Sequence, residues 1–158
     1  FSAHSPYNSS ADASGDIRVQ PGDRIPGIPR DALKLRARYA LGGASIGASI
    51  ALFSGQHARG DENNGDANGR VPGYAIAGLD AQWDVARGWR LFATVENLFN
   101  SRYAASRTLG GNFFTAPQNS FDAGNVRAEQ FRTPGAPRGI WVGIAWRPDE
   151  PAGRLARQ

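Results

Sequence analysis

The sequence of 158 residues contains no cysteine and no methionine. The absence of cysteine excludes disulfide bonds, thiolate metal sites and cysteine nucleophiles, and it fits an oxidising compartment in which stray disulfides would form. The chain also has no run of the roughly 18 consecutive apolar residues that a transmembrane helix needs. If the protein has a role in a membrane, strands must therefore cross it.

The chain also lacks an initiating methionine, and no charged and then apolar leader is found at Phe1. We therefore expect it to be a piece of a longer protein whose signal sequence and N-terminal domains lie upstream. The net charge is +4, but the Lys and Arg residues are scattered, with no basic run and no nucleic-acid motif. A generally basic surface is thus a better interpretation than nucleic acid binding.

Alternation of apolar and polar side chains with a period of two is the strongest pattern in the chain, and it is typical of β-strands. The apolar residues of the last such segment share one face: Ile140, Val142, Ile144 and Trp146. The pattern predicts strands near residues 32–41, 44–53, 74–85, 89–100 and 138–147. Two prolines and several charges follow, so residues 149–158 are expected to form a polar tail.

The lengths of the connections between these strands also form a pattern. Short turns at 42–43 and 86–88 alternate with long polar loops at 5–31, 54–73 and 101–136. Outer-membrane barrels have short periplasmic turns and long extracellular loops, whereas a soluble sandwich has no reason to place every long loop at one end. The sequence therefore predicts an all-β protein, an antiparallel meander of about five to six strands that forms a partial wall of a transmembrane β-barrel.

One face of the predicted strands is charged. Its six predicted lumen-facing residues are Lys34, Arg36, Arg38, Asp80, Asp84 and Glu96. Three cations on one strand would be unfavourable in a dry core, because an unpaired buried charge costs several kcal/mol. A water-filled or plugged lumen tolerates them, and the carboxylates are expected to pair with arginines there. A solvent-facing side of a soluble sheet explains the first strand equally well.

Three tryptophans fall near the ends of strands: Trp83, Trp89 and Trp146. Aromatic residues that crowd one set of strand ends are typical of an interfacial girdle at the level of the lipid headgroups. We predict that these three form a periplasmic aromatic girdle. A tryptophan cluster in a protein core is the alternative.

The long loop at 101–136 mixes aromatic rings with guanidinium groups. The candidate ligand-binding residues are Tyr103, Arg107, Phe113, Phe114, Arg127 and Arg132. Such groups suit a planar, anionic or catechol-like ligand. The alternative is that the phenylalanines, with Phe121, pack the loop onto itself or line the edge of the outer leaflet.

No motif of a hydrolase, a P-loop or a dinucleotide-binding enzyme is found in its required context, so we expect no enzyme and no cofactor. His4 and His57 lie in polar loops with no third ligand nearby, and we expect them to be solvated and to bind no metal. Residues 61–69, DENNGDANG, superficially resemble a calcium loop. Gly65 comes one position early and no glutamate closes the loop, which favours a solvated surface loop.

Two strings near the end of the chain carry a resemblance to a known family. VENLFNSRYA at 95–104 is followed, after the long loop, by PGAPRGIWVGIAW at 134–146. Together they resemble the C-terminal end of TonB-dependent outer-membrane receptors, in which an Asn-Leu-Phe-Asn element marks the penultimate strand and a Pro-Arg pair opens the final one. Residues 22–39 and 54–74 are also similar to this family.

The resemblance implies that residues 1–148 are the C-terminal part of a receptor barrel in the outer membrane of a Gram-negative bacterium. It implies uptake of a ferric siderophore or similar nutrient, driven by TonB–ExbB–ExbD through an N-terminal plug that this chain lacks. Outer-membrane lipid and the outer-membrane assembly machinery are the other expected partners. The chain alone is expected to be inactive. A passive porin or adhesin-type barrel and a soluble β-sheet ligand-binding domain are the alternatives.

Overall fold

The computed structural model describes residues 1–148 as strands, turns and loops. Within these residues, no helix has the length and hydrophobicity needed to cross a membrane. The chain divides into two compact units, each built from three segments. The first unit comprises Phe1–Asp31, Ser54–Gly73 and Tyr103–Gly135, and the second comprises Ala32–Phe53, Tyr74–Arg102 and the described part of Ala136–Gln158. The polar tail predicted at 149–158 lies outside the described residues.

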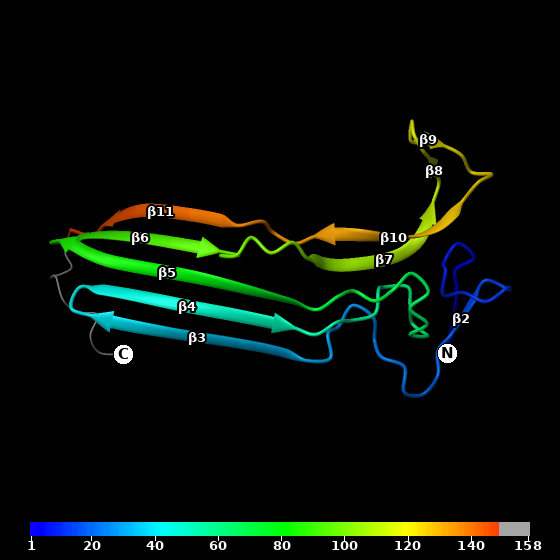
Figure 1. Ribbon diagram of the computed structural model, residues 1–158, viewed down its shortest axis with the longest axis horizontal. Coiled ribbons are helices and arrows are strands. Elements are labelled where there is room, and N and C mark those ends of the chain that lie inside the picture. The colour runs from blue at the N-terminus through cyan, green and yellow to red at the C-terminus, as the bar shows by residue number, and fades with distance from the viewer. Residues whose placement is uncertain (149–158) are drawn as a thin grey trace. The chain divides into compact units, whose positions relative to one another are not determined.

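The second unit is a five-stranded antiparallel sheet with the order β11-β6-β5-β4-β3 (Figure 1). Its strands are β3 (Ala32–Leu41), β4 (Ala44–Phe53), β5 (Tyr74–Ala86), β6 (Trp89–Glu96) and β11 (Gly139–Trp146). Strands β3 to β6 follow one another across the sheet, and β11 then pairs with β6. The two edges of the sheet are therefore β3 and β11.

The register keeps apolar side chains together on one face of this sheet. One row runs across all five strands, from Tyr39 through Ile46, Ala81 and Ala93 to Val142. None of the buried hydrophobic residues of the described chain belongs to the sheet. Its apolar face therefore has no core to cover it within the second unit.

Two tight turns close one end of the sheet. Gly42 and Gly88 have φ values of 58° and 76°, in the left-handed region that glycine adopts without a steric penalty. The backbone ladder continues up to both turns, since the Asp84 N–H donates to the Gly43 carbonyl at 2.8 Å and the Arg147 N–H donates to the Gly88 carbonyl at 2.7 Å. Short connections therefore join β3 to β4 and β5 to β6.

Strand β6 ends before the predicted boundary of the 89–100 segment, because the chain turns at two asparagines. Asn97 and Asn100 have φ values of 49° and 51°, which asparagine tolerates better than most residues. Asn97 is 3% exposed, and its amide donates to the carbonyls of Ser101 and Ala136, each at 3.0 Å. The end of the predicted strand is therefore a corner held by side-chain hydrogen bonds.

The first unit contains three two-stranded antiparallel sheets. They pair β1 (Ser2–His4) with β2 (Asp16–Arg18), β7 (Ala104–Asn112) with β10 (Arg127–Pro134), and β8 (Phe114–Thr115) with β9 (Ser120–Phe121). Its buried hydrophobic cluster consists of Ala58, Val71 and Leu109. The segment 54–73 therefore packs on β7, and the backbone of Arg59 extends this contact as a bridge to β7.

The prediction of an uninterrupted loop over 101–136 is wrong, because β7 and β10 form a hairpin within it. The segment 5–31 likewise contains β2. Strand β7 reads AASRTLGGN, and only Leu109 among these residues is a large apolar residue. Such a strand leaves no period-two signal, since its pairing depends on the backbone ladder and not on an apolar face.

Candidate functional site

Charged side chains on the polar face of the second unit form ion pairs across strands. Asp80 on β5 binds both arginines of β3, since Oδ2 accepts from Arg38 Nη2 at 2.7 Å and Oδ1 accepts from Arg36 Nη2 at 3.0 Å. On the next pair of strands, Asp84 Oδ1 accepts from Arg90 Nε at 2.6 Å. Two of the three predicted carboxylates are thus paired with cations on their own face.

A glycine makes the ion pairs between Asp80 and the β3 arginines possible. Strand β4 lies between β3 and β5, and its residue Gly47 is in register with Arg38 on one side and with Asp80 on the other. A Cβ atom at this position would stand 2.5 Å from Asp80 Oδ1, well inside van der Waals contact. Because Gly47 has no side chain, the carboxylate of Asp80 reaches across a whole strand.

The other predicted lumen-facing residues lie on the same face of the sheet. Lys34 Nζ is 5.8 Å from the centroid of the Phe53 ring, a cation–π distance. Glu96 is in register with Gly139 on β11. The register therefore places all six predicted charged residues on the face opposite to the apolar row.

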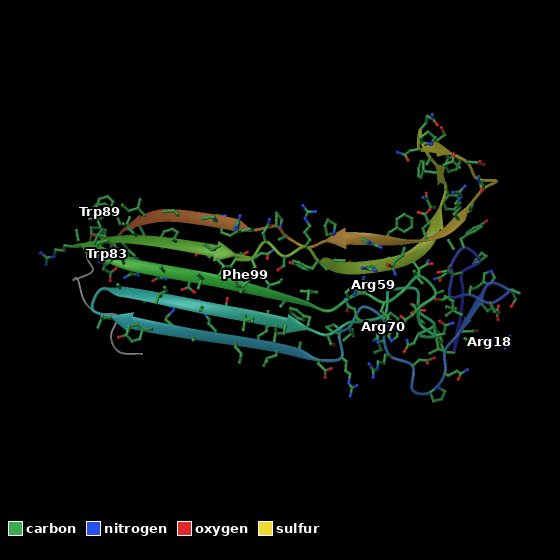
Figure 2. All side chains as sticks on the ribbon, in the orientation of Figure 1. Arg18, Arg59, Arg70, Trp83, Trp89 and Phe99 are labelled. Carbon is green, nitrogen blue, oxygen red and sulfur yellow. The ribbon has the colours of Figure 1, made fainter. Side chains whose placement is uncertain are left out.

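The three tryptophans lie near the end of the sheet that the short turns close. The rings of Trp89 and Trp146 have centroids 6.0 Å apart and planes inclined by 33°. Figure 2 shows Trp83 and Trp89 at the same end of the sheet. All three are exposed, with 58%, 41% and 59% of Trp83, Trp89 and Trp146 accessible. Such exposure does not fit a buried tryptophan cluster.

In the first unit, the β7–β10 hairpin brings two of the predicted ligand-binding arginines together. Arg107 and Arg132 are directly opposite in register and share one face. Burial lowers the pKa of the Arg107 guanidinium, and the positive charge of Arg132 lowers this pKa further. Arg107 Nη1 donates to Gln130 Oε1 at 2.7 Å and to the Arg70 carbonyl at 3.4 Å. Arg107 therefore also holds the segment that contains Arg70 against the hairpin.

Two further predicted residues lie elsewhere on the same hairpin. Arg127 is in register with Asn112, on the face opposite to Arg107. Tyr103 lies at the base, where its ring covers Gly135 so closely that a Cβ atom there would overlap the ring. The structure thus gathers the predicted residues on one hairpin but does not direct them to a single point.

The phenylalanines form an aromatic cluster beyond the tip of the hairpin. Phe113 meets Tyr7 edge to face at 5.7 Å and stacks on Phe121 at 6.2 Å. Phe114 meets Phe121 edge to face at 6.0 Å. Phe114 and Phe121 remain 55% and 69% exposed, so the cluster joins loop residues to each other and still presents ring surface to the outside.

A cluster that the sequence pattern did not predict lies in the segment 54–73. His57 Nδ1 is 2.8 Å from Asp66 Oδ1 and 3.4 Å from Asp61 Oδ2. His57 and Asp61 are only 8% and 1% exposed. The predicted solvation of the histidines is therefore confirmed for His4, whose side chain is 66% exposed, and wrong for His57. The expectation that no third ligand lies nearby is also wrong for His57, since carboxylate oxygens of Asp61 and Asp66 lie beside it.

Comparison with models of protein families decides the family of the chain. Residues 3–98, more than half of the 158, match the family described as TonB dependent receptor-like, beta-barrel. The chain belongs to the TonB-dependent receptor β-barrel family. The family predicted from the sequence motifs and the all-β antiparallel fold are thereby confirmed.

Solved structures of three receptors have a similar fold. The siderophore receptor PiuA from Acinetobacter baumannii matches 79% of this chain at 17% identity with a TM-score of 0.57. The ferric-catecholate import receptor Fiu from E. coli K12, in its closed form, matches 86% at 22% identity with a TM-score of 0.52. A variant of the ferric enterobactin receptor PfeA from Pseudomonas aeruginosa matches 75% at 24% identity with a TM-score of 0.52. These identities show a shared fold alone.

The chain spans 15% of the PiuA and Fiu chains and 16% of the PfeA chain. No curated protein sequence matches it significantly. In a closed TonB-dependent receptor barrel every strand has two neighbours, which removes all sheet edges. Here β3 and β11 have one neighbour each, and every residue of β3 is exposed.

Sequence reasoning missed the buried cluster of this receptor chain because its packing depends on a distant residue. Ser10 Oγ donates to Asp61 Oδ1 from 51 positions away along the chain. A local signal was nevertheless present, since His57, Asp61 and Asp66 are four and five positions apart within one loop. That spacing matches no metal-binding motif, so the sequence alone favours a solvated loop over a metal site.

Proposed function

We propose that this chain is the C-terminal barrel segment of a TonB-dependent outer-membrane transporter that takes up a ferric siderophore or a similar nutrient. The observation that carries the proposal is the two-faced sheet of the second unit, in a chain that belongs to the receptor barrel family. The names of PiuA, Fiu and PfeA describe receptors for siderophores, ferric catecholates and ferric enterobactin. These names support a ferric siderophore as the class of cargo.

We assign the apolar face of the sheet to lipid and the polar face to the barrel lumen. Tyr39 and Val142 on the apolar face are 65% and 77% exposed, which is unfavourable over such an area in water and favourable against acyl chains. On the polar face, Arg36 stays 62% exposed while it binds Asp80, as a hydrated lumen permits. The exposed tryptophans at the end with short turns suit a periplasmic girdle.

The segments of the first unit then belong to the extracellular side, where barrel loops are long. We assign ligand contact to the β7–β10 hairpin and its tip, through Tyr103, Arg107, Phe113, Phe114, Arg127 and Arg132. Guanidinium groups and aromatic faces bind planar anions such as catecholates. Arg132 is exposed whereas Arg107 is half-buried and bonded internally, so Arg132 is the better placed of the two to touch a ligand.

Transport requires parts of the protein that this chain does not contain. A chain that spans 15% of PiuA needs the remaining strands to close a barrel, and a plug through which TonB–ExbB–ExbD supplies energy. We place the complete protein in the outer membrane of a Gram-negative bacterium, inserted by the outer-membrane assembly machinery. We assign it no enzymatic reaction, and we expect no transport by the chain alone.

The test is uptake of a radiolabelled ferric catecholate by a Gram-negative host that lacks its own siderophore receptors. The full-length protein is expected to support uptake only when TonB is functional, and the 158-residue chain is expected to support none. Arg132→Gln should weaken uptake more than Arg18→Gln, which changes an exposed arginine outside the hairpin. Equal uptake without TonB would point instead to a passive porin, and a chain that is soluble without detergent would point to a soluble domain.

A further inference from the structure

Three side chains of the segment 54–73 bring together atoms that can bind a metal ion. His57 Nδ1 and one carboxylate oxygen each from Asp61 and Asp66 all lie within 4.8 Å of one another. We propose that these residues form a binding site for a divalent transition-metal ion of the zinc type, in which water completes the coordination. The site lies wholly within the first unit and does not depend on the proposed transport.

The separations between the ligand atoms are close to those of a zinc site. Zinc binds histidine nitrogen and carboxylate oxygen at about 2.0–2.2 Å, so neighbouring ligand atoms in a tetrahedral site are about 3.3 Å apart. The distances from His57 Nδ1 are 2.8 Å to Asp66 Oδ1 and 3.4 Å to Asp61 Oδ2. The two carboxylate oxygens lie within 4.8 Å of each other, so binding would require them to approach each other, and the Asp66 side chain, which is 27% exposed, has room to rotate.

The surrounding groups hold the outer carboxylate oxygens, while the inner oxygens face His57, and Asp61 Oδ2 also accepts from the Asp66 backbone N–H at 3.1 Å. Ser10 Oγ donates to Asp61 Oδ1, and Arg70 Nε lies 3.7 Å from Asp66 Oδ2. Outer partners of this kind fix the orientation of ligating side chains in metal sites. Asp61 Oδ2 and Asp66 Oδ1, the oxygens nearest to His57, are therefore the two that would bind the ion.

Burial and charge also favour a cation at this position. Asp61 is 1% exposed, and a buried carboxylate needs a compensating positive charge. His57 is also largely buried, at 8% exposed, so a cation held between the three side chains would be shielded from water, and this shielding strengthens its attraction to the carboxylates.

The chemistry of the ligand atoms selects the class of metal. One imidazole nitrogen with two carboxylate oxygens suits zinc and its neighbours in the first transition row. Calcium and magnesium prefer shells made of oxygen alone. Without a metal, His57 would simply contact the two carboxylates directly, and this arrangement is the competing explanation.

The experiment measures zinc binding by the full-length, untagged protein purified in detergent and stripped with a chelator. Equilibrium dialysis against Zn²⁺ gives the stoichiometry and Kd, and Co²⁺ gives a visible spectrum that reports nitrogen and oxygen ligands. The variants are His57→Asn and Asp66→Asn, and the second changes the less buried carboxylate in case the first does not fold. His4→Asn and Asp31→Asn are matched controls, because both side chains are exposed and outside the cluster.

We expect the wild-type protein and both controls to bind one Zn²⁺ that the His57→Asn variant does not bind. Asp66→Asn should raise the Kd for Zn²⁺ at least tenfold and should change the Co²⁺ spectrum. Equal Zn²⁺ binding by all five proteins would overturn the proposal. A wild-type protein that binds no Zn²⁺ would also overturn it, because this is the result expected if His57 and the two carboxylates only contact one another. Loss of siderophore uptake would leave the metal measurement unaffected, so the two proposals fail separately.

Discussion

Replacement of Gly47 by alanine tests how Asp80 connects strands that are not neighbours. The new Cβ would stand 2.5 Å from Asp80 Oδ1 and 2.8 Å from its Cγ. Since β4 is held on both sides by its ladder, the carboxylate has to move. It then loses its bonds to Arg36 and Arg38.

The size of the effect follows from the exposure of these ion pairs. The Asp80 side chain is 20% exposed, and those of Arg36 and Arg38 are 62% and 45% exposed. Pairs as exposed as these contribute about 0.2–1 kcal/mol each, so both together contribute roughly 0.5–2 kcal/mol. Alanine is itself favoured over glycine in a strand by roughly 0.5–1 kcal/mol, which masks part of the loss in a single variant.

A double-mutant cycle separates the two contributions. In the Asp80→Ala background, Gly47→Ala should raise the free energy of unfolding by about 0.5 kcal/mol, because only the strand preference remains. In the wild-type background it should lower or barely change the free energy of unfolding, because the loss of the ion pairs opposes the strand preference. The difference between the two backgrounds is the coupling, roughly 0.5–2 kcal/mol. The assay is reversible urea unfolding of the full-length protein in detergent, followed by tryptophan fluorescence.

Gly43→Ala is the matched control, because a Cβ there would meet its nearest atoms at 3.4 Å, an ordinary contact. It should show no coupling to Asp80→Ala. If Gly47→Ala changes the unfolding free energy equally in both backgrounds, the carboxylate of Asp80 does not depend on the space above Gly47. That result would refute the reasoning.

Three further substitutions test the corner, the hairpin and the tryptophan pair. Asn97→Ala removes three part-buried hydrogen bonds, two that the amide donates to backbone carbonyls and one that its Oδ1 accepts from the Ser101 N–H. It should cost about 2–4 kcal/mol, measured as a lower urea midpoint. Arg132→Gln removes the charge directly opposite Arg107 and should stabilise the protein by about 0.2–1 kcal/mol in the same assay. Trp89→Leu separates the ring pair with Trp146 and should cost about 0.5–1.5 kcal/mol beyond the change in buried area.

Each of these substitutions has a result that would contradict its premise. An Asn97→Ala protein as stable as the wild type would mean that water replaces the amide at the corner. An Arg132→Gln protein that is less stable would mean that Arg132 makes a favourable contact stronger than its repulsion with Arg107. If Trp89→Leu costs the same in a Trp146→Leu background, the two rings do not stabilise each other.

The sequence predicts the sheet of the second unit well for a physical reason. Where one face of a strand is apolar, the period of two appears directly in the order of residues, and residues 32–41 and 44–53 coincide with β3 and β4. The pairing of Asp80 with the β3 arginines is also foreseeable, since register follows from the alternation. The role of Gly47 is not foreseeable from the sequence, because a glycine occurs within strands for several different structural reasons.

The first unit is less predictable because its contacts come from distant parts of the chain. Strand β7 has no apolar face, so its pairing leaves no pattern in the sequence. His57 is buried because Ser10 and Asn63 tie two distant loops together, through hydrogen bonds that span 51 and 53 positions. Local composition describes this segment as a polar loop, and only the tertiary structure shows a buried charged cluster.

The unpaired outer edge of β3 has a consequence for handling the protein. All ten residues of β3 are exposed, and its free amide and carbonyl groups can accept a strand from any neighbouring chain. The large apolar residues on one face of the same strand favour such pairing, while the three cations on its other face oppose it. The chain produced in isolation is therefore expected to assemble edge to edge into oligomers. A separate strand that pairs with the free edge of β3 should prevent this assembly.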